Sequence, residues 1–102
     1  MSQFLTALPV FNEEKYVQEV LDQVLQHTDH VLVVDDGSTD NTTSILKERV
    51  KARGDVTVIH HETNRGYGAA LATAFAYALH PREDGTRWKG LITIDCDGQH
   101  QP

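Results

Sequence analysis

VLVVDDGS, residues 31–38, is the stretch that decides the fold. Its first four residues form an unbroken run of β-branched and leucine side chains, which is typical of a parallel strand that helices cover on both faces. Asp35 to Ser38 then end the run with two carboxylates, a glycine and a hydroxyl, which are residue types that form turns. We therefore expect a buried strand that presents polar groups at its carboxyl end.

The same alternation of strand and helix continues on both sides of this stretch. Short apolar runs predict further strands, and apolar residues at helical spacing predict the helices between them. The predicted strands are Phe4–Leu8, Val31–Val34, Val56–Ile59 and Leu91–Ile94, and the predicted helices run from Asn12 to about Thr28, from Ile45 through Val50 to a cap at Gly54, and from Ala69 to Leu79. Pro9 is expected to end the first strand because it has no amide hydrogen. Asn12 is expected to cap the first helix.

Strands that alternate with helices at this spacing favour right-handed crossovers and a parallel sheet. We expect an α/β fold with a doubly wound, mostly parallel sheet in three layers, α/β/α, and the common strand order 3-2-1-4. In such sheets ligands bind in the crevice beyond the carboxyl ends of the strands. The polar clusters of the sequence fall at these ends, at residues 9–14, 35–40, 64–68 and 95–100.

Length and charge narrow the range of functions. With 102 residues the chain is expected to hold at most one domain, residues 1–102, and a formal net charge of −6 argues against nucleic acid as a partner. The basic side chains in the second predicted helix are interpreted as a solvated face; they are Lys47, Arg49, Lys51 and Arg53. One cysteine forms no internal disulfide, and the sequence shows no signal peptide and no stretch long enough to span a bilayer. A cytoplasmic location is expected.

Asp95 and Asp97 are the candidate metal ligands. Residues two apart in extended backbone point to the same side, so both carboxylates can face the crevice after the last predicted strand. Carboxylates alone would repel a diphosphate, whereas Mg²⁺ or Mn²⁺ prefers hard oxygen ligands and joins carboxylates to substrate phosphates. Spacing alone leaves open the alternative that these residues form a simple turn with Gly98.

Two further clusters are candidate ligand contacts. In the first, residues 33–38, a carboxylate at the end of a buried strand, Asp35 or Asp36, can accept hydrogen bonds from a base or a ribose. The alternative for this cluster is a helix N-cap formed by Ser38 or Asp40. The stretch NRGYG, residues 64–68, places Arg65 and two glycines before a predicted helix, whose exposed amides favour an anion.

The adjacent histidines His60 and His61 carry a weaker signal. In a strand, neighbouring side chains point to opposite faces, so the two rings are not expected to share a metal. Cys96 is interpreted as a small buried side chain and not as a nucleophile, because no base lies next to it in the sequence.

Four stretches together resemble the nucleotide-sugar-binding part of family 2 glycosyltransferases, particularly the polyprenyl-phosphate, dolichol-phosphate mannosyltransferase-like branch. They are ALPVFNEE at 7–14, VVDDGSTDNT at 33–42, NRGYGAAL at 64–71 and DCDGQHQP at 95–102. Their order and spacing cover nearly the whole chain. The resemblance implies a Rossmann-like sheet, the nucleotide-binding half of the type A glycosyltransferase fold.

The resemblance also implies roles for individual residues. Asp36 would contact the base, and Asp97 would be the better metal ligand of the family's D-x-D pair. The donor-binding residues that it implies are Pro9, Phe11, Glu13, Asp36, Arg65, Gly66, Asp95 and Gln99, and the metal ligands are Asp95 and Asp97. The implied cofactor is Mg²⁺ or Mn²⁺.

The implied reaction is inverting transfer of a sugar from a UDP- or GDP-sugar to a polyprenyl phosphate or another acceptor. Family members continue beyond the D-x-D segment with an acceptor-binding half and often with membrane helices. We therefore expect a truncated chain that is inactive alone and whose catalytic residues lie elsewhere. We expect the complete protein to act at the cytoplasmic face of a membrane. The alternatives are a non-catalytic nucleotide-binding fragment and a D-x-D-G phosphohydrolase, in which Asp95 would be the nucleophile.

Overall fold

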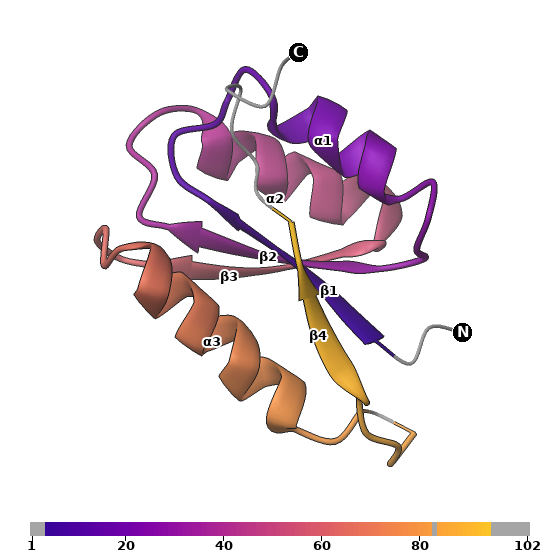
Figure 1. Ribbon diagram of the computed structural model, residues 1–102. Coiled ribbons are helices and arrows are strands. Elements are labelled where there is room, and N and C mark those ends of the chain that lie inside the picture. The colour runs from indigo at the N-terminus through magenta and orange to yellow at the C-terminus, as the bar shows by residue number, and fades with distance from the viewer. Residues whose placement is uncertain (1–3, 83, 95–102) are drawn as a thin grey trace.

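The structure is a computed structural model that describes residues 4–82 and 84–94. The described chain alternates strand and helix throughout (Figure 1). The elements are β1 (Phe4–Val10), α1 (Val17–Val24), β2 (Val31–Asp36), α2 (Thr42–Arg53), β3 (Val56–His61), α3 (Tyr67–Leu79) and β4 (Gly90–Thr93). The strands form one parallel sheet in the order β3-β2-β1-β4. The predicted α/β class, parallel pairing and strand order are confirmed.

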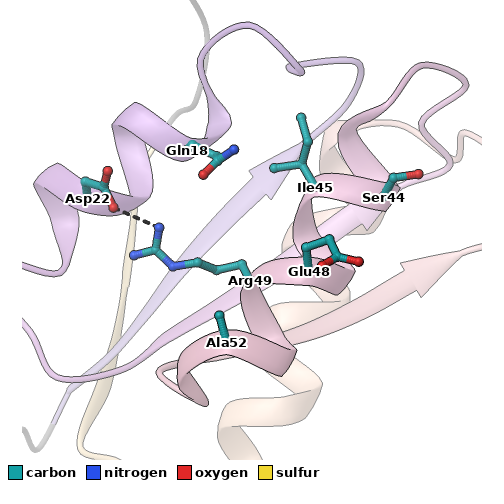
Figure 2. A pocket seen from close by; sticks show the side chains of 7 residues that line it. All are labelled: Gln18, Asp22, Ser44, Ile45, Glu48, Arg49 and Ala52. Atoms are coloured by element: carbon teal, nitrogen blue, oxygen red, sulfur yellow. Dashed lines mark hydrogen bonds and ion pairs between the residues drawn. The ribbon is translucent and has the colours of Figure 1, made fainter.

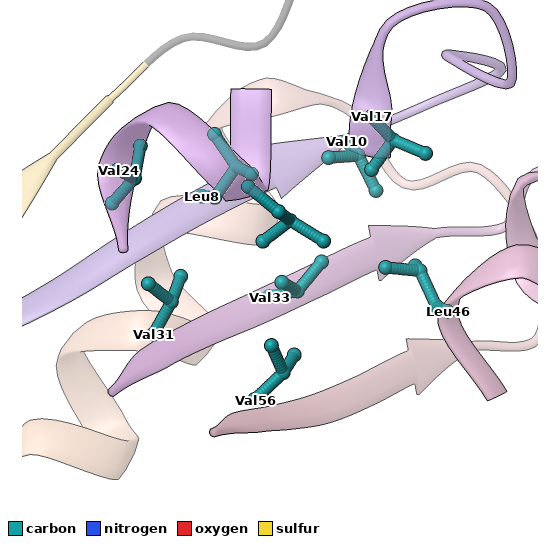
Figure 3. Packing of buried hydrophobic residues seen from close by; sticks show 9 residues of the cluster. Leu8, Val10, Val17, Val24, Val31, Val33, Leu46 and Val56 are labelled. Atoms are coloured by element: carbon teal, nitrogen blue, oxygen red, sulfur yellow. The ribbon is translucent and has the colours of Figure 1, made fainter. Parts of the chain in front are cut away.

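Helices cover both faces of the sheet, with α1 and α2 on one face and α3 on the other (Figure 1). The side chains of β2 alternate between two apolar clusters because successive residues of a strand point to opposite faces. Val31 and Val33 belong to the cluster under α1 and α2, which Figure 3 shows. Leu32 and Val34 pack under α3 with Ala70. These four apolar side chains of β2 are fully buried, and the burial of each stabilises the fold by about 1.5–3 kcal/mol.

The alanine-rich helix α3 lies against the sheet through its smallest side chains. Ala70 and Ala74, one turn apart, are its buried residues. The predicted helix is confirmed, although α3 begins at Tyr67 and not at Ala69. Within the described part of the chain, no helix is both long enough and apolar enough to cross a bilayer.

The prediction that Pro9 ends the first strand is wrong, because β1 continues to Val10 and pairs Pro9 with Val34 of β2. The amide of Ile94 donates to the carbonyl of Ala7 at 3.0 Å, so the polar backbone groups of Ala7 point toward β4. Those of Pro9, two residues on, point to the same side. The missing amide hydrogen therefore removes no bond between β1 and β2.

Two other element boundaries differ from the sequence prediction. Helix α1 begins at Val17, so Asn12 is not its cap; Asn12 has a left-handed φ of 52° and lies in the preceding loop. Strand β3 continues beyond Ile59 to His61, because His60 and His61 pair with Asp35 and Asp36 of β2. The first difference arises from contacts between loops, and the second from strand pairing; both lie at the carboxyl edge of the sheet.

Candidate functional site

The loops that follow β1, β2 and β3 meet at the carboxyl edge of the sheet. Asn12 joins the first loop to the second. Its side-chain oxygen accepts hydrogen bonds from the amides of Thr39 at 2.7 Å and Asp40 at 3.3 Å. The backbone amide of Asn12 donates to the Ser38 hydroxyl at 3.0 Å. These contacts account for the positive φ of Asn12, because asparagine tolerates the left-handed region better than most residues.

The start of α2 adds a second connection between the same two loops. The buried Thr42 hydroxyl accepts a hydrogen bond from the Glu13 amide at 2.9 Å and donates to Asp40 Oδ1 at 2.5 Å. Asp40 also accepts from the Thr42 amide at 2.9 Å, which forms an Asx turn. The N-cap of α2 is Asn41, so neither Ser38 nor Asp40 is the cap that the sequence suggested.

Gly37 joins the second loop to the third by close backbone approach. Its φ is 73°, and a Cβ placed on it would lie 2.3 Å from the backbone carbon of Thr63 and 2.4 Å from the backbone nitrogen of Asn64. No side chain fits in that space. The group that approaches Gly37 so closely is the loop after β3.

The two carboxylates of β2 point to opposite faces of the sheet. Asp35 points toward α2, where its Oδ2 accepts hydrogen bonds from the Thr43 hydroxyl at 2.6 Å and lies 3.1 Å from His60 Nδ1, and its Oδ1 accepts from the Ser38 amide at 3.2 Å. Burial raises the pKa of Asp35, but the hydrogen bonds from Ser38, Thr43 and His60 outweigh it and hold the pKa below the ordinary 3.8. Asp35 is thus an ionised structural group beneath the loop.

Asp36 points toward α3 and holds the loop after β3. Its Oδ1 lies 2.7 Å from His61 Nδ1 and accepts the Arg65 amide at 2.9 Å, and its Oδ2 accepts the Gly66 amide at 2.8 Å. Burial raises the pKa of Asp36, but the hydrogen bonds from His61 and the two amides, with the charge of His61, lower it below 3.8 overall. The loop amides that we expected to meet an anion are therefore engaged by the protein's own carboxylate.

The predicted donor-site residues that the structure describes lie along this carboxyl edge. Pro9 is buried in β1, Phe11 is 43% exposed beyond its end, and the Glu13 backbone binds Thr42. Arg65 and Gly66 lie in the loop that Asp36 holds. The predicted residues Asp95, Asp97 and Gln99 lie outside the described residues, as does Cys96.

Sequence reasoning missed the two Asp–His pairs, although the sequence holds a signal for them. The strands begin in register, Val31 beside Val56, so counting along both strands places Asp35 beside His60 and Asp36 beside His61. The prediction that the two histidines point to opposite faces is confirmed: His60 contacts Asp35 on the α2 side, and His61 contacts Asp36 and Thr73 of α3 on the other.

A divalent metal is the cofactor that the sequence implies, and the chemistry of the candidate donors suits it. Asp95 and Asp97 would offer hard carboxylate oxygens, the ligands that Mg²⁺ and Mn²⁺ prefer. Among residues 4–82 and 84–94, no group of three or more His, Cys, Asp or Glu side chains converges to hold a metal. The described residues thus supply no competing metal site.

A groove of about 580 Å³ lies between α1 and α2 (Figure 2), and none of the predicted donor-site residues lines it. Its lining residues are Gln18, Asp22, Ser44, Ile45, Glu48, Arg49 and Ala52. The prediction that Arg49 is solvated is wrong, because its side chain is only 9% exposed and its Nη1 donates to Asp22 Oδ1 at 2.8 Å. Helix α1 covers this face of α2, and Asp22 provides the guanidinium with a partner.

The family of the chain follows from comparison with known proteins. A family model described as Glycosyl transferase family 2 matches residues 6–102. The chain belongs to this family. Its parallel sheet with helices on both faces is the Rossmann-like, nucleotide-binding half of the type A glycosyltransferase fold.

Two of the named relatives carry a lipid carrier, dolichyl phosphate or polyprenol, in their names. The chain is 34% identical to the UDP-N-acetylglucosamine–dolichyl-phosphate N-acetylglucosaminyltransferase of Methanococcus voltae, over 93% of this chain and 41% of that protein. It is 33% identical to the polyprenol monophosphomannose synthase of Mycolicibacterium smegmatis, over 96% of this chain and 36% of that protein.

A solved structure confirms the fold. Residues 1–349 of S. aureus TarS, crystallised in complex with UDP, superpose with a TM-score of 0.71 at 30% identity, over 95% of this chain and 28% of that one. The chain spans about two fifths of the length of the curated relatives it matches, 37%, 41% and 42% for three of them.

Proposed function

We propose that this chain is the donor-binding part of a glycosyltransferase that transfers a sugar from a UDP- or GDP-sugar to a polyprenyl phosphate. The observation that carries the proposal is the buried, ionised Asp36 at the carboxyl end of β2, in a chain that belongs to family 2. The names of the dolichyl-phosphate and polyprenol relatives support a lipid-phosphate acceptor. The UDP complex of TarS supports a nucleotide donor.

Asp36 has the acceptor capacity that contact with a base requires. An ionised carboxylate offers about four lone-pair positions, two on each oxygen. Among the described residues, Oδ1 has contacts with His61 and the Arg65 amide, whereas Oδ2 accepts only the Gly66 amide. The second position on Oδ2 would accept an N–H of uracil or guanine.

The other donor-site residues would surround the nucleotide. Pro9, Phe11 and Glu13 would line its pocket along the end of β1, and Phe11 already exposes an apolar ring there. Arg65 has an exposed side chain on a loop whose backbone Asp36 fixes. Its guanidinium would bind a phosphate of the donor, because Arg forms charge-assisted bonds with phosphate oxygens.

Mg²⁺ or Mn²⁺ would be held by Asp95 and Asp97, with Gln99 near the diphosphate. Bound there, the ion would neutralise the negative charge that develops on the departing nucleoside diphosphate. The acceptor phosphate is already ionised at neutral pH, so its attack on the anomeric carbon, with inversion, requires no strong base. We place this reaction at the cytoplasmic face of a membrane, where the lipid acceptor would be available.

Calorimetry with UDP and with GDP, each with and without Mn²⁺, tests the donor site. We expect the chain to bind one of these nucleotides in the presence of Mn²⁺, and we expect Asp97→Ala to weaken binding about tenfold or more, which is about 1.4 kcal/mol. Asp29→Ala is the matched control, since it removes the same charge from an exposed residue that precedes β2 at the opposite edge of the sheet. It should leave the affinity unchanged.

Each contrary result has a defined meaning. Binding that is equally tight without Mn²⁺ would remove the metal from the proposal. The absence of binding to both nucleotides would contradict the donor site itself. Release of phosphate from p-nitrophenyl phosphate, lost in Asp95→Ala, would instead favour the phosphohydrolase.

A further inference from the structure

Asp36, His61 and Thr73 form a row of contacting side chains, which runs from the carboxyl edge of the sheet to helix α3. The carboxylate lies 2.7 Å from Nδ1 of His61, and Nε2 of the same ring lies 2.8 Å from the hydroxyl of Thr73. The side chains of Asp36 and His61 are each only 5% exposed. Both ring nitrogens therefore have a partner, and the ring has little room to turn.

The strand register fixes this arrangement. Asp36 and His61 are partners in the parallel ladder between β2 and β3, so their side chains leave the sheet on the same face at the same level. Thr73 lies on α3, which covers that face. The imidazole thus spans the space between the end of the sheet and the helix.

The hydrogen-bond geometry assigns the proton on the ring. A carboxylate only accepts, so Nδ1 of His61 must carry the hydrogen that it shares with Asp36. In the neutral ring Nε2 then accepts the Thr73 hydroxyl hydrogen, and in the protonated ring it donates to the same oxygen. Because the hydroxyl can rotate to suit either state, Asp36 keeps its partner in both.

Asp36 transmits this constraint to the loop before α3. Its two oxygens accept the amides of Arg65 and Gly66, and Gly66 is the N-cap residue of α3. If the imidazole were absent, the carboxylate would lose its lateral contact and could rotate about its own side-chain bonds. The Arg65 backbone and the spare acceptor position of Oδ2 would then both lose their fixed directions.

We propose that His61, backed by Thr73, is a positioning residue of the nucleotide site. It fixes the rotamer of Asp36, and through Asp36 it fixes the base acceptor and the loop that carries Arg65. The inference rests on the proposed function only for the identity of the ligand. The ordering of the loop is a property of the chain itself.

Three substitutions separate the contacts. His61→Ala removes the ring and both of its contacts, to Asp36 and to Thr73. His61→Asn keeps an N–H donor close to the position of Nδ1 but loses the contact with Thr73. Thr73→Val removes only the hydroxyl and keeps the shape of the side chain. Two measurements are made on each: amide hydrogen exchange at Arg65 and Gly66 without nucleotide, and calorimetry with UDP and GDP in the presence of Mn²⁺. Urea unfolding shows whether each variant is folded.

In folded His61→Ala we expect the Arg65 and Gly66 amides to exchange at least about tenfold faster and nucleotide affinity to fall about tenfold, since a hydrogen bond to a charged group is lost. His61→Asn should restore most of both, and Thr73→Val should have an intermediate effect. If His61→Ala does not fold, His61→Asn decides, because it keeps an N–H donor toward Asp36. Amide exchange and affinity close to the wild-type values support the proposal, and a loss as large as that expected for His61→Ala contradicts it.

The two measurements distinguish the failure of this inference from that of the proposed function. If the wild-type chain binds nucleotide and none of the variants changes amide exchange or affinity, the positioning role is wrong and the donor site stands. If exchange at Arg65 and Gly66 responds as expected but the wild-type chain binds neither nucleotide, the donor site is wrong. If His61 had only a structural role, His61→Ala and His61→Asn would lose equal stability, and asparagine would not restore nucleotide affinity.

Discussion

Position 37 requires a glycine for two separate reasons, its backbone conformation and the lack of space for a Cβ. The φ of 73° disfavours any residue with a Cβ, and the space that a Cβ would take is filled by the backbone of Thr63 and Asn64. A backbone obstacle cannot rotate away as a flexible side chain can. Gly54, at the end of α2, has almost the same φ, 71°, but a Cβ there would meet nothing within 4 Å.

These two glycines give a matched test of close packing against strain. Gly54→Ala should cost about 1–2 kcal/mol, the usual penalty for a left-handed L-residue. Gly37→Ala carries the same strain and also forces the loop after β3 away from β2. We therefore expect Gly37→Ala to lower the free energy of unfolding more than Gly54→Ala, as measured by urea denaturation. Equal losses would mean that the approach of Thr63 to Gly37 is not a constraint.

At the scale of the elements, Arg49 connects α2 to α1 (Figure 2). Its Nη1 donates to Asp22, but its Nε and Nη2 are buried and have no hydrogen-bond partner among the described residues. Asp55 Oδ1 lies 3.8 Å from Nε, too far for a hydrogen bond. A buried cation with incomplete partners contributes less to stability than an apolar side chain of similar size.

The interface between α1 and α2 should therefore tolerate the loss of this charge. We expect Arg49→Met to leave the free energy of unfolding unchanged or to raise it, because the methionine fills the same space and leaves no unpaired donor. Asp22→Ala should lower the free energy of unfolding by about 1–3 kcal/mol, because the buried guanidinium of Arg49 then loses its hydrogen-bond partner. Lys47→Met, which removes an exposed charge from the same helix, is the control. A large loss in Arg49→Met would show that the ion pair holds the two helices together.

The type of each element could be predicted from the sequence, but the ends of several elements could not. The apolar runs fixed the strands because burial depends on side-chain pattern. The boundaries at Pro9, Val17 and His61 depend on tertiary contacts: the backbone direction at Pro9, the loop contacts of Asn12, and the pairing of His61 with Asp36. Local propensity carries no information about such partners.

At the scale of the whole molecule, the parallel order of the strands brings the loops together, and this the sequence did predict. The sequence could not predict which polar groups at this edge bind other parts of the protein and which keep an acceptor position for a ligand. Asp35 and Asp36 look alike in the sequence, yet the first holds α2 through Thr43 and the second holds the loop before α3 through Gly66. That division follows from strand alternation only after the register with β3 is known.

The ionised carboxylates of this edge make the stability of the molecule depend on pH. The folded-state pKa values of Asp35, Asp36 and Asp40 lie below the ordinary 3.8, because hydrogen bonds outweigh the effect of burial. Between the folded pKa and 3.8 the unfolded chain binds more protons than the folded chain, so stability rises with pH there. Their contribution is complete above the unfolded pKa and is lost as pH falls through 3.8 toward the folded pKa.

We therefore expect the free energy of unfolding to decline steeply as pH falls below about 4, by up to about 1.4 kcal/mol per pH unit for each such group. Asp36→Asn removes one carboxylate whose pKa differs between the folded and unfolded states. The unfolding free energy of this variant should therefore be lower near neutral pH but should decline less steeply in acid. Asp29→Asn, at the opposite edge of the sheet, is the control for loss of charge. Urea denaturation from pH 3 to pH 6 measures the slopes. The same slope in Asp36→Asn and in the wild-type chain would show that Asp36 is not held ionised by His61 and the loop amides.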